Sequence, residues 1–216
     1  TFVSSCAFGL EHQQGSVDTR EEPWTAEIVE WSLPPDFVPR QGVAVDITEL
    51  REIADQGVAL AQFAVGEHYA AGYGVAKDMR EAIKWYRKAA DQGCAEAQHS
   101  LGMSYARGEG VAKDMQEAAK WYRMAGNQGH AVAQWALGMS YVAGEGVPKN
   151  PQEAVKWFQK SATLGYPLAQ YTLACCYHNG NGVPPDKNEA VKWLRRAADQ
   201  GYAKAQYDVA ISYYCG

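Results

Sequence analysis

The sequence predicts an all-α solenoid built from helix-turn-helix repeats. Three observations support this fold class: identical residues recur every 36 positions, each repeat contains two stretches with helical periodicity, and glycine-containing turns separate those stretches. A fixed period of about 20 to 50 residues is typical of proteins in which each unit buries its apolar face against its neighbours. No stretch shows the period-two alternation of a strand.

Five columns of identical residues define the repeat. They are Ala61, Ala97, Ala133, Ala169 and Ala205; Gln62, Gln98, Gln134, Gln170 and Gln206; Tyr69, Tyr105, Tyr141, Tyr177 and Tyr213; Trp85, Trp121, Trp157 and Trp193; and Gly57, Gly93, Gly129, Gly165 and Gly201. They divide the chain into a non-repeat segment, 1–45, and a solenoid, 46–216. The solenoid comprises a partial unit at 46–57, full units beginning at 58, 94, 130 and 166, and a truncated unit at 202–216.

The first helix of a unit, helix A, is predicted from Ala61 to about Ala71. Its apolar residues at Ala61, Val65 and Tyr69 follow an i, i+4, i+8 spacing, which places them on one helical face. It ends at Gly72-Tyr73-Gly74, and the same GxG pattern returns at Gly108, Gly144 and Gly180. The two glycines supply the positive φ angles that a tight reversal requires.

The second helix, helix B, is predicted to begin with a capping box, in which an N-cap side chain and a glutamate three residues later bond each other's backbone N–H groups. The pairs are Asp78 with Glu81, Asp114 with Glu117, Asn150 with Glu153, and Asp186 with Glu189; Pro151 occupies a first helical position, where its missing N–H costs nothing. Helix B turns Ala82 and Trp85 inward and Arg80, Lys84, Arg87 and Lys88 outward, and it ends at Gly93.

The two ends of the chain depart from the repeat. Asp46 and Glu49 predict one more capping box, followed by Leu50, Ile53 and Ala54, so a lone B-type helix is expected to cover the first A helix. The last A helix lacks its B helix at Gly216; either more repeats follow or this helix is the cap. In 1–45 little regular structure is expected, and Trp24, Ile28 and Trp31 are expected to pack on the first repeat or to occupy a groove as an internal ligand mimic.

Composition excludes several function classes. The formal net charge of −5 leaves no basic excess for nucleic acid or anionic membranes. The sequence contains no run of about 18 apolar residues, so no transmembrane helix is predicted. The chain begins at Thr1, which indicates a processed or trimmed start. Val3-Ser4-Ser5-Cys6 resembles a lipobox, so a lipid anchor at Cys6 or a plain tail is expected there.

The five cysteines and five histidines show no metal-ligand spacing, so neither metal nor cofactor is expected.

The repeat resembles the Sel-one-like repeat family, a relative of the tetratricopeptide repeat. The resemblance rests on A-Q-x-x-[LV]-[GA]-x-x-Y, then GxGV, a capping Asp or Asn, A-x-K-W-[YFL] and a final glycine, over roughly 46–216. It implies a right-handed superhelix of antiparallel helix pairs with A helices lining the concave side. It also implies an adaptor that holds other proteins together, as in bacterial secreted or periplasmic factors, although the compartment stays open here.

The variable positions of helix A predict where a partner binds. On a helical wheel, positions 61, 62, 65, 66 and 69 share one arc, and the changing positions 63, 67, 70 and 71 lie opposite, so we expect the latter to line the concave face. They supply Phe63, Glu67, His99, Met103, Arg107, Trp135, Met139, Tyr171, Cys175, His178, Tyr207 and Ile211 as predicted partner-binding residues. We call this set the ladder.

Rings and methionines are enriched at protein-binding hot spots, so the ladder predicts a groove for a peptide or partner helix with Trp135 as the central anchor. The alternative is that the rings pack between neighbouring A helices as core. In the adjacent pair, Cys176 is expected to pack and Cys175 to face the groove, without a disulfide between them.

A second function class is a structural scaffold of an envelope or secretion complex, which spaces fixed partners rather than binding a mobile ligand. A hydrolase-type enzyme is a more distant alternative, because no serine has the Ser-x-x-Lys spacing of β-lactam-binding enzymes. The GxG turns join two helices, which is the wrong context for a dinucleotide site.

Overall fold

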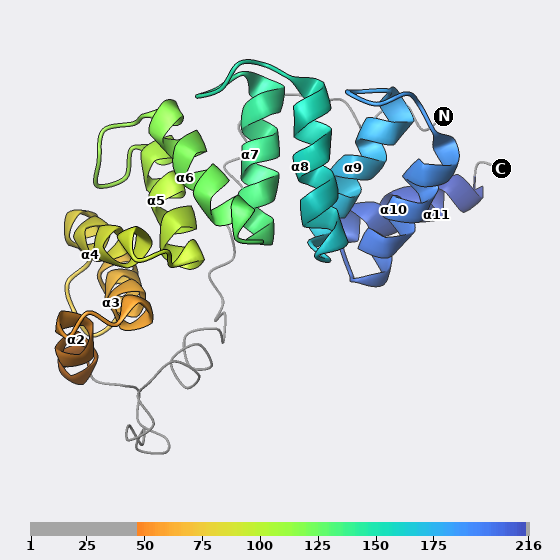
Figure 1. Ribbon diagram of the computed structural model, residues 1–216. Coiled ribbons are helices and arrows are strands. Elements are labelled where there is room, and N and C mark those ends of the chain that lie inside the picture. Colours follow the sequence, from red (N-terminus) through yellow and green to blue (C-terminus); the bar gives the residue numbers. More distant parts are fainter. Residues whose placement is uncertain (1–46, 215–216) are drawn as a thin grey trace. The chain divides into compact units, whose positions relative to one another are not determined.

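The structure is a computed structural model that describes residues 47–214. These residues form ten α-helices and no strand, joined by short turns (Figure 1). The A helices are α3 (Ala59–Ala71), α5 (Ala95–Arg107), α7 (Ala131–Ala143), α9 (Pro167–Asn179) and α11 (Ala203–Tyr214). The B helices are α2 (Ile47–Asp55), α4 (Met79–Asp91), α6 (Met115–Asn127), α8 (Pro151–Thr163) and α10 (Lys187–Asp199). The predicted all-α fold of helix-pair repeats is confirmed.

The contacts divide the chain into two compact units. Their described parts are 47–114, called the N-terminal unit, and 115–214, called the C-terminal unit. The N-terminal unit contains α2 to α5, and the C-terminal unit contains α6 to α11.

Within each unit, helices that follow one another in the chain pack together, as α7 and α8 do side by side in Figure 1. In the N-terminal unit, α2 covers α3, and Leu50, Ala54, Val65 and Trp85 belong to one buried cluster. The lone B-type helix is therefore present. Its expected cap residue Asp46 lies outside the described residues, as do the expectations for Cys6 and for 1–45.

Each A helix before α11 ends on a left-handed glycine. Gly144, for example, has φ +76°, and its N–H donates to the Ser140 carbonyl oxygen at 2.8 Å, while the Glu145 N–H donates to the same oxygen at 3.1 Å. This arrangement satisfies carbonyls that a helix terminus would otherwise leave unpaired. The predicted role of the first glycine in each GxG turn is correct.

The predicted capping boxes are half right. Asp78 and Asn150 accept backbone N–H donors of the first helical turn, as expected of N-cap residues. The glutamates do not reach back to the N-cap N–H: Glu81, for example, pairs with Lys84 at 2.6 Å. The N-cap N–H instead donates to a tyrosine carbonyl of the preceding A helix, as Asp78 does to Tyr69 at 2.9 Å. The reciprocal bond of a capping box is thus replaced by a bond between the two helices of a repeat.

A glutamine, buried in α3, α5, α7 and α9 and exposed in α11, joins each A helix to the B helix before it. The side-chain Nε2 donates to a carbonyl oxygen at the end of that helix at 2.8–3.2 Å in all five cases: Gln62 to Ala54, Gln98 to Ala90, Gln134 to Gly126, Gln170 to Ala162 and Gln206 to Ala198. We call this contact the glutamine clasp. It explains why glutamine recurs at this position, since its Nε2 gives a second donor to a helix-end carbonyl that also accepts a backbone N–H from the following glycine, as Ala90 does from Gly93.

A second glutamine extends the clasp, for example in the first and fourth full repeats. Gln92 donates to Gln62 Oε1, and Gln200 donates to Gln170 Oε1, each at 2.8 Å. In the third full repeat the corresponding residue is Leu164, whose side chain is 57% exposed. The Oε1 atom of Gln134 is consequently buried without a hydrogen-bond partner among the described residues.

Replacing Leu164 with glutamine is expected to stabilise the C-terminal unit by about 1 kcal/mol, because a buried acceptor gains its donor. The backbone is suited to the change, since Leu164 and Gln200 have nearly the same φ and ψ angles. The denaturation midpoint measures the effect. Gln200→Leu is the reverse control and should destabilise the same unit by a similar amount. Equal midpoints for wild type and Leu164→Gln would contradict the account of the clasp.

Candidate functional site

The ladder residues of the N-terminal unit form a partly exposed surface. Phe63, Glu67, His99 and Met103 are half-buried, and Arg107 is exposed. Phe63 and Glu67 lie one helical turn apart on α3, and His99 and Met103 hold the equivalent positions on α5. These side chains are at least partly exposed to solvent.

The ladder of the C-terminal unit is more mixed. Trp135, Met139, His178 and Ile211 are half-buried, and Tyr207 is 63% exposed. In contrast, Tyr171 and Cys175 are each only 6% exposed. These two residues therefore belong to the core. The predictions that Tyr171 and Cys175 line the groove are wrong, whereas Cys176 is buried as expected.

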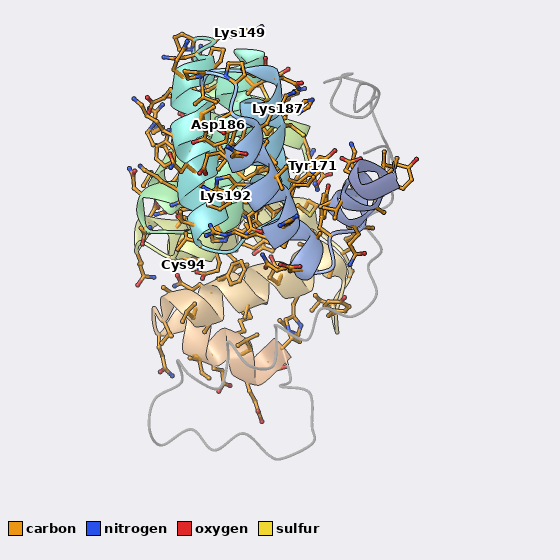
Figure 2. The ribbon with its side chains drawn as sticks, turned by 90° about the vertical axis from the view of Figure 1, so that its right-hand side faces the viewer. Cys94, Lys149, Tyr171, Asp186, Lys187 and Lys192 are labelled. Carbon is orange, nitrogen blue, oxygen red and sulfur yellow. The ribbon has the colours of Figure 1, made fainter. Side chains whose placement is uncertain are left out.

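Hydrogen bonds also join neighbouring A helices at the ladder. Trp135 Nε1 donates to Thr172 Oγ1 on α9 at 3.2 Å, and the Tyr171 hydroxyl donates to Asp208 Oδ2 on α11 at 3.0 Å. Figure 2 shows Tyr171 on the side of α9 that faces α11. The ladder of this unit thus packs partly between repeats, which was the alternative interpretation, and its exposed part is smaller than expected.

Two tyrosines that the sequence argument missed extend the exposed part. Tyr166 and Tyr202 immediately precede α9 and α11 and are half-buried. The Tyr166 ring contacts Trp135 edge-on with centroids 6.2 Å apart, and the Tyr202 ring contacts Tyr171 at 5.3 Å. Burial raises the pKa of both tyrosine hydroxyls, so both stay neutral donors near neutral pH. The sequence could have identified them, because their repeat position varies and becomes tyrosine in the last two units: it holds Val58, Cys94, His130, Tyr166 and Tyr202.

We call Trp135, Tyr166, Tyr202 and Tyr207 the aromatic cluster. The buried Tyr171 supports it from within, and Lys204 Nζ lies 5.2 Å from the centre of the Tyr171 ring. Tyrosine and tryptophan bury large area at low entropic cost and keep a polar atom available. The cluster therefore has the composition of a protein-binding hot spot.

A second feature lies in the N-terminal unit around Glu67. The Tyr86 hydroxyl on α4 donates to Glu67 Oε1, and the rings of Tyr86 and Phe63 lie 5.9 Å apart at an angle of 34°. Burial raises the pKa of the Glu67 carboxyl, outweighing the lowering effects of the Tyr86 hydrogen bond and of nearby His68. Burial also raises the pKa of Tyr86, so its hydroxyl keeps the proton that it donates.

Glu67 should make folding stability depend on pH. Because its pKa is raised in the fold, the folded state binds the proton more tightly than the unfolded chain does, and stability falls as pH rises from about 4.5 through the folded-state pKa. Glu67→Gln removes this dependence and retains an acceptor for Tyr86. The stability of wild type relative to Glu67→Gln, from denaturation midpoints at several pH values, is expected to decrease with rising pH. A constant difference would show that the carboxyl does not titrate abnormally.

Three further features of the described residues are the state of the cysteines, the grouping of possible metal ligands and the length of the helices. Cys94, Cys175 and Cys176 form no disulfide with one another or with any other described residue. Burial raises the pKa of Cys94 to about 11, so this thiol stays protonated at neutral pH. Over the described range, no three His, Cys, Asp or Glu side chains are grouped to hold a metal ion. No helix in that range is long and apolar enough to cross a bilayer.

Comparisons with known proteins identify the repeat. The Sel1 repeat family model matches 59–94, 95–130, 131–166 and 167–202. Among solved structures, the chain is similar to a protective antigen with an SLR fold from uropathogenic Escherichia coli strains, with 37% identity, a TM-score of 0.73, and coverage of 75% of this chain and 35% of that one. It is also similar to a Sel1 repeat protein from Oxalobacter formigenes, with 39% identity, a TM-score of 0.69, and coverage of 74% and 63%, respectively.

Both relatives are longer than the matched region. This chain spans about a third of the length of the Escherichia coli antigen and somewhat under two thirds of the length of the Oxalobacter formigenes protein. A search of curated proteins finds no match.

Proposed function

We propose that this chain, which belongs to the Sel1 repeat family, is an adaptor that binds a segment of a partner protein through the aromatic cluster of its C-terminal unit. Sel1 repeat proteins are generally protein-interaction scaffolds and are typically non-enzymatic, as the resemblance noted in the sequence implied. The partner segment and the binding residues are the part of the proposal that goes beyond the family.

One observation carries the proposal: Tyr207 on α11 is 63% exposed, and the same unit carries the half-buried rings of Trp135, Tyr166 and Tyr202. An aromatic side chain left in water forgoes the free energy of its burial, about 2 kcal/mol or more for a ring of this size. A partner that covers these rings recovers that free energy. The tyrosine hydroxyls orient the partner through hydrogen bonds. A peptide or a partner helix laid across α7, α9 and α11 is the occupant that this composition favours.

The test uses two tyrosines that are almost equally exposed. Tyr207 lies in the aromatic cluster, whereas Tyr73 is 61% exposed in the turn after α3. Partners captured from an extract of the source cell by the wild-type chain are identified, and their affinities for the variants are then measured. Tyr207→Ala is expected to weaken binding about tenfold or more, and Tyr73→Ala is expected to leave it unchanged.

Trp135→Ala tests the central anchor, with a thermal melt to check folding because Trp135 also bonds Thr172. Trp135→Phe keeps most of the ring and loses only that bond, so it should bind better than the alanine variant. Partners that bind wild type and both tyrosine variants equally would contradict the proposal. They would favour a scaffold that uses the B helices or 1–45.

A further inference from the structure

We infer that Glu67 is a binding point for a lysine or arginine side chain of the partner segment. This inference rests on the proposed function, because it assumes that the A-helix surface receives a protein segment. It adds a chemical requirement on that segment, located in the N-terminal unit and separate from the aromatic cluster.

Glu67 is the only acidic residue of its ladder column among the described repeats. The equivalent positions hold Met103, Met139, Cys175 and Ile211, all uncharged. Tyr86 faces Glu67, whereas the same two positions are Met103 and Tyr122 in the second repeat and Met139 and Phe158 in the third. The first repeat therefore has a hydrogen-bonded carboxyl where the next repeats have an uncharged side chain.

This replacement is costly for the free protein. A carboxylate removed from water is unstable unless a cation or several donors compensate it. Glu67 accepts one bond from a neutral hydroxyl, and within 47–214 it takes part in no ion pair. The pKa of Glu67 is raised for this reason, since the effect of burial outweighs the lowering effects of the Tyr86 hydrogen bond and of His68.

A cation from a partner would restore the missing charge. A buried ion pair gains little when two solvated charges must both be desolvated. Here the carboxyl is already half-buried in the fold, so most of its desolvation cost does not recur on binding, and the attraction to an incoming cation is gained more fully. The same feature that destabilises the free carboxylate thus favours a positively charged ligand and disfavours an acidic or phosphorylated one.

The surroundings also suit a long basic side chain. Phe63 lies one helical turn before Glu67, and its ring is tilted by 34° against that of Tyr86. Aliphatic stems of lysine and arginine pack on such rings, and their charged heads are attracted to ring faces as well as to carboxylates. The ligand class is therefore an alkylammonium or guanidinium group carried on a peptide chain.

The test selects ligands from a library of random 16-residue peptides displayed against the wild-type chain, Glu67→Gln and Met103→Gln. Glu67→Gln removes the charge and keeps an acceptor for Tyr86, and Met103→Gln is the matched control at the same position of the next repeat. Peptides selected by wild type and by Met103→Gln are expected to be enriched in lysine or arginine at one position. This enrichment should disappear with Glu67→Gln.

A double-mutant cycle on one selected peptide then localises the contact. Its basic residue is replaced with norleucine, and affinity is measured with wild type and Glu67→Gln. Each single change is expected to weaken binding about tenfold, and the second should add little in the background of the first. Independent, additive losses would overturn the contact with Glu67.

The two proposals fail in different ways. Peptides that lose affinity with Tyr207→Ala but show no basic enrichment attributable to Glu67 would overturn the cation site alone. A library that yields no peptide dependent on either surface would overturn the proposed function, and this inference with it.

Discussion

Replacing Gly146 with alanine is expected to destabilise the C-terminal unit by about 4 kcal/mol. Gly146 is the second glycine of a GxG turn and has φ +72°, a conformation that L residues adopt at a cost of about 1 to 2 kcal/mol. In addition, a Cβ atom at this position would lie 1.8 Å from the carbonyl oxygen of Met115, the first residue of α6. Since the obstacle is backbone, relief requires the turn and the helix to move apart.

A matched variant separates the two costs. Gly74 occupies the same position of the first turn with φ +69°, but the nearest atom to its added Cβ is Ile47 Cγ2 at 3.9 Å. Gly74→Ala should therefore show only the cost of the positive φ. Gly129→Ala is the control within the C-terminal unit, because φ is +91° and no atom lies within 4 Å of its added Cβ. Chemical denaturation of the three variants measures the difference, and similar losses for all three would show that the turns are not in tight contact.

Replacing Gly138 with alanine is expected to destabilise the same unit by about 2 kcal/mol, although alanine favours helix over glycine by about 1 kcal/mol. The added Cβ would lie 2.5 Å from Cε1 and 2.6 Å from Cδ1 of the Phe158 ring, and both residues are buried. The well-packed ring has to move or the helices have to separate.

The next repeat indicates how the clash is avoided. There the equivalent pair is Ala174 and Leu194, both buried in one cluster. Alanine is larger than the glycine it corresponds to, and the leucine facing it is smaller than phenylalanine. Adding Phe158→Leu to Gly138→Ala should consequently recover most of the loss, whereas Phe158→Leu alone should leave a cavity and destabilise. Unfolding free energies of the two singles and the double form a cycle, and additive effects would refute the contact.

Much of the fold was accessible from the sequence because its determinants are local and repeated. The helix ends follow from N-cap side chains such as Asp78 and from left-handed glycines such as Gly72, whose effects are confined to a few neighbouring residues. The buried columns follow from repetition, since Ala61, Gln62 and Val65 recur with one packing role and are all buried.

The remainder depends on contacts between segments, which no local pattern encodes. The second glycine of a turn is required by a carbonyl about 31 residues earlier, as with Gly146 and Met115, and not only by its own φ. Likewise, the sequence cannot show that Tyr171 is buried, because that depends on Asp208 of the following repeat. The exposed surface of the ladder was for this reason overestimated in the C-terminal unit.

The hydrogen bonds between helices join residues that are close together in the sequence, and this has a kinetic consequence. The glutamine clasp spans 8 residues, Arg123 to Tyr141 spans 18, the paired glutamines span 30, and Tyr171 to Asp208 spans 37. Each of these contacts closes only a short loop, so the entropy lost in forming it does not grow as repeats are added. Chains of different repeat number should therefore refold at similar rates, since ordering can start in any adjacent helix pairs and spread to their neighbours.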